Sequence, residues 1–449
     1  MYFDLPVLHV TISGVDDEYH RLSLPSGITL LTVPMAGVES LTLLVMVRTG
    51  SRDEPEKLAG ISHFLEHMVF KGTQKYPTAY EVTSAIDSIG GEFNAYTSKE
   101  FTGFYIKLAA SHFQRGAELL SEILVRPRLA AKDVGKEKGV IIEEINMYDD
   151  LPPKKVADVY ERLIYGDTNL GRETIGNRSS VKAITRKDLL TYLRQRYTSG
   201  RLVIGVVGGM KNAGLSQSAI RDSLGQAFAG LPQGKDGWGK PAILHQAKPA
   251  VSFFKKQTGQ SHFILGVRTF PRGHKHRYAL GVLTTILGGS ASSRLFTEIR
   301  EKRGLAYYVK ADIDTYFDGG DLSVSAGVDT NQIDTAVRLV IEQFRNVGRN
   351  TGKGSITNEE VSQAKEFLKG RFILELEDSH DLADLFVRRF LLERKILTPN
   401  QYLSRISAVT REDIVRVART IFTEKNLNLA IVGPYNKSHR QRFMKLLRI

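Results

Sequence analysis

The sequence of 449 residues contains no cysteine, which excludes disulfide bonds and thiolate ligands for a metal. Any metal site must therefore be built from histidine and carboxylate side chains. No apolar run approaches the roughly 20 residues that a membrane-spanning helix needs. Residues 1–10, MYFDLPVLHV, lack the basic and apolar segments of a signal peptide. We therefore expect no membrane association and a cytoplasmic location.

The sequence also lacks the patterns of common nucleic-acid-binding domains, since it has neither zinc-finger spacing nor an aromatic-basic RNA-binding motif. Its formal charge of +13 would suit a polyanion. However, the lysines and arginines are dispersed, with only modest clusters at Lys255-Lys256 and near the C-terminus. We expect a solvated basic surface and no nucleic-acid partner.

An internal repeat organises the chain. A strand-like segment that ends at Val47 returns in the second half, where it ends at Val267. Three later landmarks recur at one constant spacing: Thr185 and Thr410, Tyr197 and Phe422, and Gly208 and Gly433. Repeats of this kind indicate duplicated structural units. The predicted division is a first domain at 1–230, a linker rich in Gly, Pro and Lys at 231–249, and a second domain at 250–449.

The mixture of elements indicates the fold class. Short alternating apolar strands, as at 28–33 and 41–48, are combined with long amphipathic helices, as at 79–89, 112–124 and 131–148. Strands that follow one another without strict β-α-β alternation favour an α+β fold. We predict two homologous domains, each a mainly antiparallel sheet with helices packed on one face.

The most specific motif is His63-Phe64-Leu65-Glu66-His67, an H-x-x-E-H pattern that is typical of one class of zinc peptidases. On a helix, His63 and His67 lie one turn apart, and Glu66 lies about 60° to one side of His63. Two neutral imidazoles suit Zn²⁺, and the neighbouring carboxylate can accept a proton from water that zinc polarises. A helix with two ordinary surface histidines would give the same five letters, so the motif needs further support.

The repeat supplies that support. In the second half, the positions that correspond to His63, Glu66 and His67 are Leu283, Ile286 and Leu287. One copy of the helix is therefore suited to burial, whereas the other carries potential metal ligands. This difference favours a metal site over a packing role for the histidines.

A zinc site of this type needs a third protein ligand. On the helix expected at 131–148, Glu137 and Glu144 lie on the apolar face, whereas Glu143 lies on a more polar flank. A carboxylate on an apolar face must be paired or bound to a cation, because burying it alone is costly. We therefore predict Glu144 as the ligand and Glu137 as a supporting carboxylate. The alternative is that Glu143 and Glu144 are both surface acids.

At this point a family resemblance emerges. The segment HFLEHMVFKGT, from His63 to Thr73, and the E-x6-E pattern from Glu137 to Glu144 resemble the M16 metallopeptidases, the pitrilysin and mitochondrial-processing-peptidase group. The resemblance covers almost the whole chain and is greatest to the short members of the family. It implies a zinc endopeptidase with one Zn²⁺ per chain, which acts on short or unfolded polypeptides. The metal ligands would be His63, His67 and Glu144, with Glu66 as the catalytic base and Glu137 in support.

A segment of the first half, GGEFNAYT at 90–97, resembles the strand of the family whose edge binds an extended peptide. This resemblance assigns Asn94 and Ala95 to substrate binding. The alternative is that Asn94 is an ordinary residue at a turn or strand end.

A segment of the second half resembles another part of the substrate site. Gly288-Gly289-Ser290 precedes a helix that contains Arg300, and Tyr307 follows seven residues later. The resemblance implies an Arg/Tyr pair that reaches the substrate carbonyl and the oxyanion of the transition state. On spacing alone, Arg300 is equally a surface residue in an ion pair.

The resemblance also implies a quaternary structure. In the family, two such units face each other around the active site, so we expect a homodimer that encloses a chamber and takes peptide substrates by size. A heterodimer is the alternative, because related pairs divide these motifs between two subunits. A non-catalytic assembly or scaffold subunit is a competing interpretation. The intact His63, Glu66, His67 and Glu144 argue against it.

Overall fold

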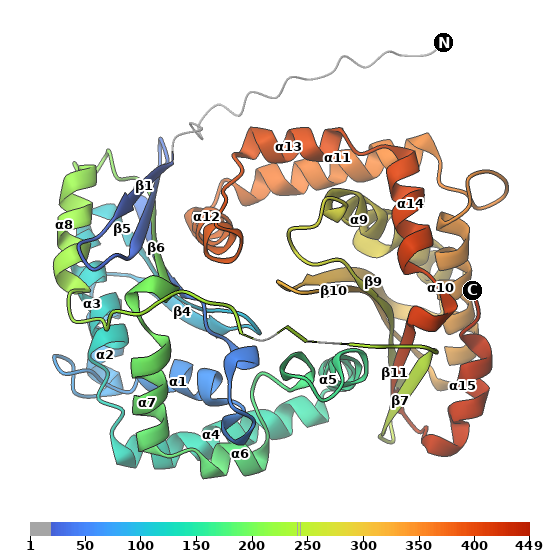
Figure 1. Cartoon of the computed structure of the whole chain (residues 1–449), viewed down its shortest axis with the longest axis horizontal. Helices are drawn as coiled ribbons and strands as arrows, with labels where there is room; N and C mark the ends of the chain where they lie inside the picture. The colour runs from blue at the N-terminus through green and yellow to red at the C-terminus, as the bar shows by residue number, and fades with distance from the viewer. Residues whose placement is uncertain (1–18, 240, 243) are drawn as a thin grey trace.

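The computed structural model describes residues 19–449 except 240 and 243 (Figure 1). The expectation about a signal peptide at residues 1–10 therefore lies outside the described residues. Within the described part, every helix is too short or too polar to span a bilayer.

Each half of the chain is built around one sheet (Figure 1). The strands of the first sheet are β1 (His20–Ser23), β2 (Thr29–Pro34), β3 (Ser40–Val47), β4 (Glu92–Thr97), β5 (Thr102–Ala109) and β6 (Leu202–Gly208). Those of the second are β7 (Ala250–Lys255), β8 (Gln260–Thr269), β9 (Ala306–Thr315), β10 (Gly320–Asp329) and β11 (Leu427–Gly433). The strands predicted at 28–33 and 41–48 correspond to β2 and β3.

The two sheets share one topology. In the described residues, their strand orders are β1-β2-β6-β3-β5-β4 and β7-β11-β8-β10-β9, which coincide when β2 is matched with β7. The pairs β2–β6 and β7–β11 are parallel, whereas the other neighbours are antiparallel. Val47 pairs with Leu202, and Val267 pairs with Leu427, so the sequence repeat marks equivalent strand pairs. The prediction of two homologous, mainly antiparallel sheets is confirmed.

Helices surround both sheets. Those of the first half are α1 (Ile61–Val69), α2 (Ala79–Asp87), α3 (Phe113–Val125), α4 (Ala131–Asp150), α5 (Pro152–Tyr165), α6 (Arg178–Ala183), α7 (Arg186–Arg196) and α8 (Gln217–Ala227). Those of the second half are α9 (Arg277–Thr284), α10 (Ile333–Val347), α11 (Asn358–Glu375), α12 (Ser379–Glu393), α13 (Pro399–Ser407), α14 (Arg411–Ile421) and α15 (Arg440–Leu446). The hydroxyls of Thr185 and Thr410 cap α7 and α14 by accepting from the amides of Asp188 and Asp413. These equivalent caps explain why the repeat is clearest at these positions.

The halves exchange one helix in each direction. Helix α12 packs against β3 and β6 of the first sheet, and α5 packs against β7, β8 and β11 of the second (Figure 1). Leu43 and Val45 of β3 face the core of their own half, whereas Leu44 and Met46 join a core with Phe386 of α12. The sequence predicted helices of each half on one face, but it did not anticipate that the other face receives a helix from the other half.

Helix α5 lies very close to the second sheet. A Cβ atom at Gly266 of β8 would lie 2.1 Å from the Tyr160 hydroxyl, so only glycine fits there. Asp321 of β10 is 2% exposed and accepts hydrogen bonds from the hydroxyls of Tyr160 and Tyr165. Burial raises the pKa of Asp321 to about 8.

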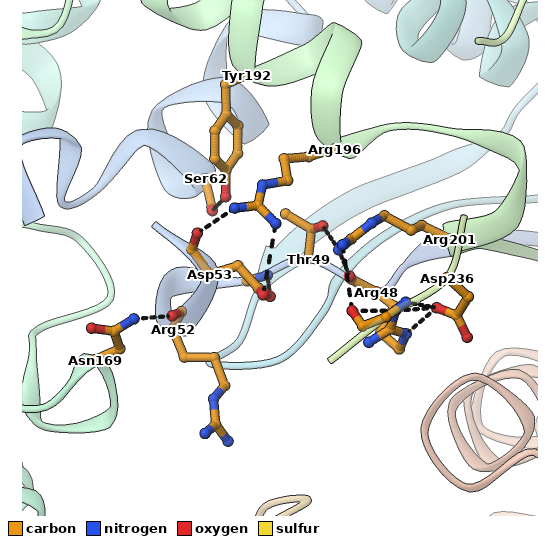
Figure 2. Close-up of polar contacts among 12 residues, drawn as sticks. Arg48, Thr49, Arg52, Asp53, Ser62, Asn169, Tyr192, Arg196, Arg201 and Asp236 are labelled. Carbon is orange, nitrogen blue, oxygen red and sulfur yellow. Dashed lines mark hydrogen bonds and ion pairs between the residues drawn. The ribbon is translucent and has the colours of Figure 1, made fainter. Parts of the chain in front are cut away.

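The segment between the two sheets is anchored to both halves. Among its described residues there is no helix or strand between the end of α8 at Ala227 and the start of β7 at Ala250. Asp236 pairs with Arg48 at the end of β3 (Figure 2) and also with Arg394 after α12. The division into domains at 231–249 stays a prediction, because the exchanged helices connect the two halves across it.

Candidate metal centre and peptide-binding edge

Helix α1 presents His63, Glu66 and His67 on the side away from its core contacts. Its apolar residues are buried: Ile61, Phe64, Leu65, Met68 and Val69. The rings of His63 and His67 lie with their centroids 4.5 Å apart, as side chains one helical turn apart do. Helix α1 packs against α4, α7 and β4, which places the histidines beside Glu144.

Glu144 on α4 approaches both histidines with the same oxygen. Its Oε2 lies 3.6 Å from Nε2 of His63 and 3.6 Å from Nε2 of His67. The three atoms lie within 4.8 Å of one another, a spacing that an ion with bonds of about 2.0–2.2 Å can bridge. Glu143 is exposed and is not part of this cluster. The geometry thus favours Glu144 over Glu143, although its role as a ligand stays a prediction.

Glu137 orients His67. Its Oε1 lies 2.9 Å from Nδ1 of His67, and its Oε2 lies 2.8 Å from Nζ of Lys71. Burial opposes ionisation of Glu137, but hydrogen bonds from His67 and Lys71 hold the pKa of this carboxyl below its usual range. An ionised Glu137 accepts a hydrogen bond from Nδ1–H of His67, so Nε2 carries the free lone pair and faces Glu144.

His63 and Glu66 are both affected by burial. Burial and the neighbouring His67 lower the pKa of His63 to about 4, so its imidazole is neutral at pH 7 and available to a metal. Burial also raises the pKa of Glu66, although a hydrogen bond of 2.5 Å from the Thr97 hydroxyl opposes this shift. A carboxylate with a raised pKa beside a metal site is suited to proton transfer.

A pocket of ≈ 310 Å³ lies over the cluster. It is lined by His63, Glu66, His67, Ala95, Tyr96, Thr97, Glu144, Tyr148, Lys154, Ala157, Asp158, Glu161, Thr174 and Ile175. Thr97 and Tyr148 were not identified from the sequence, although Tyr148 follows Glu144 at the i+4 spacing of a helical contact. Asp158 and Glu161 on α5 carried no sequence signal, because the turn from α4 into α5 is a tertiary feature.

The predicted substrate strand is β4, which lies at the edge of the first sheet and pairs on one side with β5. Ala95 lines the pocket, whereas Asn94 is exposed and does not line it. The Asn94 side chain instead accepts a 2.8 Å hydrogen bond from the Ala95 amide. A peptide that paired with this amide would have to displace the Asn94 side chain.

Arg300 and Tyr307 contact each other but do not line the pocket that contains His63. The Arg300 guanidinium lies 5.8 Å from the centre of the Tyr307 ring. A β-bulge between β9 and β10 leaves Tyr307 without a cross-strand partner and 77% exposed. Arg300 forms no salt bridge with any described residue, so the ion-pair alternative has no support among them.

Two family models match the chain. Residues 33–178 match the model described as insulinase, peptidase family M16, and residues 183–368 match the model described as the peptidase M16 inactive domain. A relative in Mycobacterium leprae, an uncharacterized zinc protease, is 36% identical over 415 residues, which cover 92% of this chain and 92% of that protein. An uncharacterized zinc protease of Bacillus subtilis is 34% identical over 417 residues, which cover 92% of this chain and 98% of that protein.

Solved structures show the same fold. A protease from Helicobacter pylori aligns with a TM-score of 0.84 at 22% identity, over 93% of this chain and all of that one (100%). A structure from Pseudomonas fluorescens, described as a peptidase M16 inactive domain, aligns with a TM-score of 0.85 at 18% identity, over 93% of this chain and 98% of that one. At these identities the likeness concerns the fold alone.

Proposed function

This chain belongs to the insulinase family of peptidases, family M16, and on that premise we propose that it is a zinc-dependent endopeptidase acting on short or unfolded polypeptides. The family and the names of the relatives support a protease role with a metal. The observation that carries the proposal is the meeting of two imidazole nitrogens and one carboxylate oxygen beside Glu66.

The residues present fit Zn²⁺. The donor set of two histidines and one glutamate is found in catalytic zinc sites, and it leaves a fourth position open. His63 is neutral at pH 7, and His67 directs Nε2 toward Glu144. We propose one ion per chain, which would act as a Lewis acid toward water and the substrate carbonyl.

Glu66 is the proposed general base. Its carboxylate would accept a proton from the attacking water and then deliver this proton to the nitrogen of the leaving amine. Thr97 holds one oxygen of this carboxylate through its hydroxyl, which leaves the other oxygen for the water.

The free edge of β4 is the proposed binding site for an extended peptide. One side of β4 has no partner strand among the described residues and offers backbone amides and carbonyls next to the pocket, so a peptide would add to the sheet there. Ala95 would contribute its backbone, and Asn94 would release the Ala95 amide when a peptide binds. Recognition through the backbone suits chains that are already unfolded.

We further propose that a second copy of the chain completes the site. Arg300 and Tyr307 are exposed and adjacent, and neither lines the pocket that contains His63. In a homodimer that encloses a chamber, this pair would face the partner's pocket and stabilise the charge that develops on the substrate carbonyl. A heterodimer would serve the same purpose if another chain supplied one of the two sites.

The proposed function is tested by metal analysis and by cleavage of a quenched peptide library with and without a chelator. We expect zinc near one per chain and cleavage that the chelator abolishes. Glu66→Gln should keep zinc and lose at least about 100-fold in turnover, because it removes the general base. The matched control, Glu143→Gln on the exposed side of α4, should keep both zinc and turnover. Wild-type protein without metal and without cleavage would instead favour a non-catalytic assembly subunit.

A further inference from the structure

We propose that Glu54 is a positioning residue for the zinc site, which acts through the backbone of α1 on the orientation of His63. This inference rests on the proposed function, because it presumes that His63 binds the metal. Glu54 lies in the loop between β3 and α1, and it does not line the pocket. Its effect on the site must therefore be transmitted by the helix.

The first turn of α1 has no capping side chain of its own. Its N-cap residue is Gly60, with a φ of 92°, and a Cβ atom there would lie 2.4 Å from the carbonyl oxygen of Ile175. A residue with a side chain is thus excluded from the position that normally supplies the cap. Glu54 supplies it instead: Oε2 accepts from the Gly60 amide at 2.7 Å, and Oε1 accepts from the Ser62 amide at 2.8 Å.

His63 depends on this cap more than His67 does. Nδ1 of His67 is held by Glu137 at 2.9 Å. Nδ1 of His63 is buried and has no hydrogen-bond partner among the described residues. Metal-binding histidines usually have their second nitrogen fixed by a hydrogen bond. The direction of the His63 ring therefore depends on its packing and on the backbone of the first turn.

Both side-chain oxygens of Glu54 are directed at the helix. Glu54 is 3% exposed and forms no salt bridge with any described residue. Burial raises the pKa of Glu54 to about 7, and the hydrogen bonds from the amides of Ser62 and Gly60 oppose this shift. These two amides lie at the N-terminus of α1, the positive end of the helix dipole. The Ser62 hydroxyl also meets the Tyr192 hydroxyl at 2.8 Å (Figure 2), so the residue before His63 is held by both backbone and side chain.

The experiment compares Glu54→Gln with Asp53→Asn. A glutamine has one acceptor oxygen, and its amide group would face the second helix amide as a donor, so the cap would be half lost. Asp53 is the matched control because it is the neighbouring, largely buried carboxylate, and it contacts Gly50 and Arg196 (Figure 2) rather than α1. The measurements are zinc affinity by competition with a chelator, the visible spectrum of the Co²⁺-substituted protein, and thermal unfolding of the metal-free protein.

We expect Glu54→Gln to weaken zinc binding by about tenfold or more, to alter the Co²⁺ spectrum, and to lower kcat while KM changes by less than about twofold. Asp53→Asn should leave zinc affinity and the Co²⁺ spectrum unchanged, even if it lowers the unfolding temperature. If Glu54→Gln does not fold, Glu54→Asp is measured instead. Its shorter side chain keeps a carboxyl group but reaches only one of the two helix amides, so we expect a smaller loss of zinc affinity than for Glu54→Gln.

Two results would overturn the inference: wild-type zinc affinity and Co²⁺ spectrum in the Glu54 variant, or an equal loss in Asp53→Asn. A wild-type protein that binds no zinc would contradict the proposed function itself. The two failures are therefore distinguishable.

Discussion

The hydroxyl of Tyr148 donates a 2.6 Å hydrogen bond to Oε1 of Glu144, one turn earlier on α4. The other oxygen of the same carboxylate faces both histidines. Tyr148 therefore determines which oxygen Glu144 presents to the candidate metal site. It supports Glu144 as Glu137 supports His67.

Removing this hydroxyl should weaken the metal site without removing a ligand. We expect Tyr148→Phe to lower zinc affinity by about tenfold, as loss of a support to a ligand commonly does. Competition with a chromophoric chelator measures the change. Tyr80→Phe is the control, since Tyr80 on α2 is 79% exposed and lies outside the pocket. Equal zinc affinities for the wild type and Tyr148→Phe would show that the hydrogen bond does not matter.

Mixing two inactive variants tests whether Arg300 and Glu66 act in different chains. Glu66→Gln and Arg300→Ala should each be strongly impaired alone. If the pair acts across a dimer, co-expression yields heterodimers in which one site has both wild-type residues, and cleavage of the quenched peptide should return. If both residues act within one chain, no heterodimer contains a complete site, and the mixture stays as inactive as its parts.

The close contact of α5 with the second sheet predicts a large effect of one methyl group. Gly266→Ala should lower the free energy of unfolding by about 1–3 kcal/mol, because its Cβ would overlap the Tyr160 hydroxyl and the Leu322 carbonyl. Urea unfolding measures this change. Gly281→Ala on α9 is the control: its Cβ would meet nothing within 4 Å, so it should be neutral or stabilise by up to about 1 kcal/mol.

Asp321 predicts a dependence of stability on pH. Its pKa is about 8 in the folded protein against a usual 3.8, so between these values the folded state keeps a proton that the unfolded chain has lost. Its contribution to the free energy of unfolding should therefore fall as pH rises from about 4 to about 8, by at most about 1.4 kcal/mol per pH unit.

Asp321→Asn should remove this part of the pH dependence, because asparagine does not titrate. Urea unfolding at pH 5, 6, 7 and 8 would show it as a shallower slope than in the wild type. Asp312→Asn, at a side chain that is 50% exposed, should leave the slope unchanged. Parallel curves for the wild type and Asp321→Asn would contradict the assignment.

The parts of the structure that follow from local pattern were predictable from the sequence. His63 and His67 share a helix face because of their spacing, and Glu144 was separated from Glu143 by the apolar character of its face. The duplicated sheets followed from the repeat, since equivalent strands carry equivalent residues. In each case, the signal lies within one element or in a comparison of two similar segments.

The remaining features depend on contacts between distant segments. The apolar face of α12 shows that the helix is buried, but it does not show which sheet buries it. Glu54 lies before the helix that it caps. Its hydrogen bonds to the amides of Gly60 and Ser62 form only because the loop folds back onto the start of α1. The absence of Arg300 from the lining of the pocket that contains His63 is likewise a property of the whole arrangement and not of the seven-residue spacing to Tyr307.

The exchange of α5 and α12 has a consequence for synthesis of the chain on the ribosome. The first sheet is complete in sequence at Gly208, but the helix that covers its second face ends at Glu393. At about 5–20 residues per second, the nascent sheet waits roughly 10–40 s with its apolar side uncovered. During this interval the growing chain is a natural client for chaperones, and a ribosome that stalls before Glu393 would release a fragment prone to aggregation.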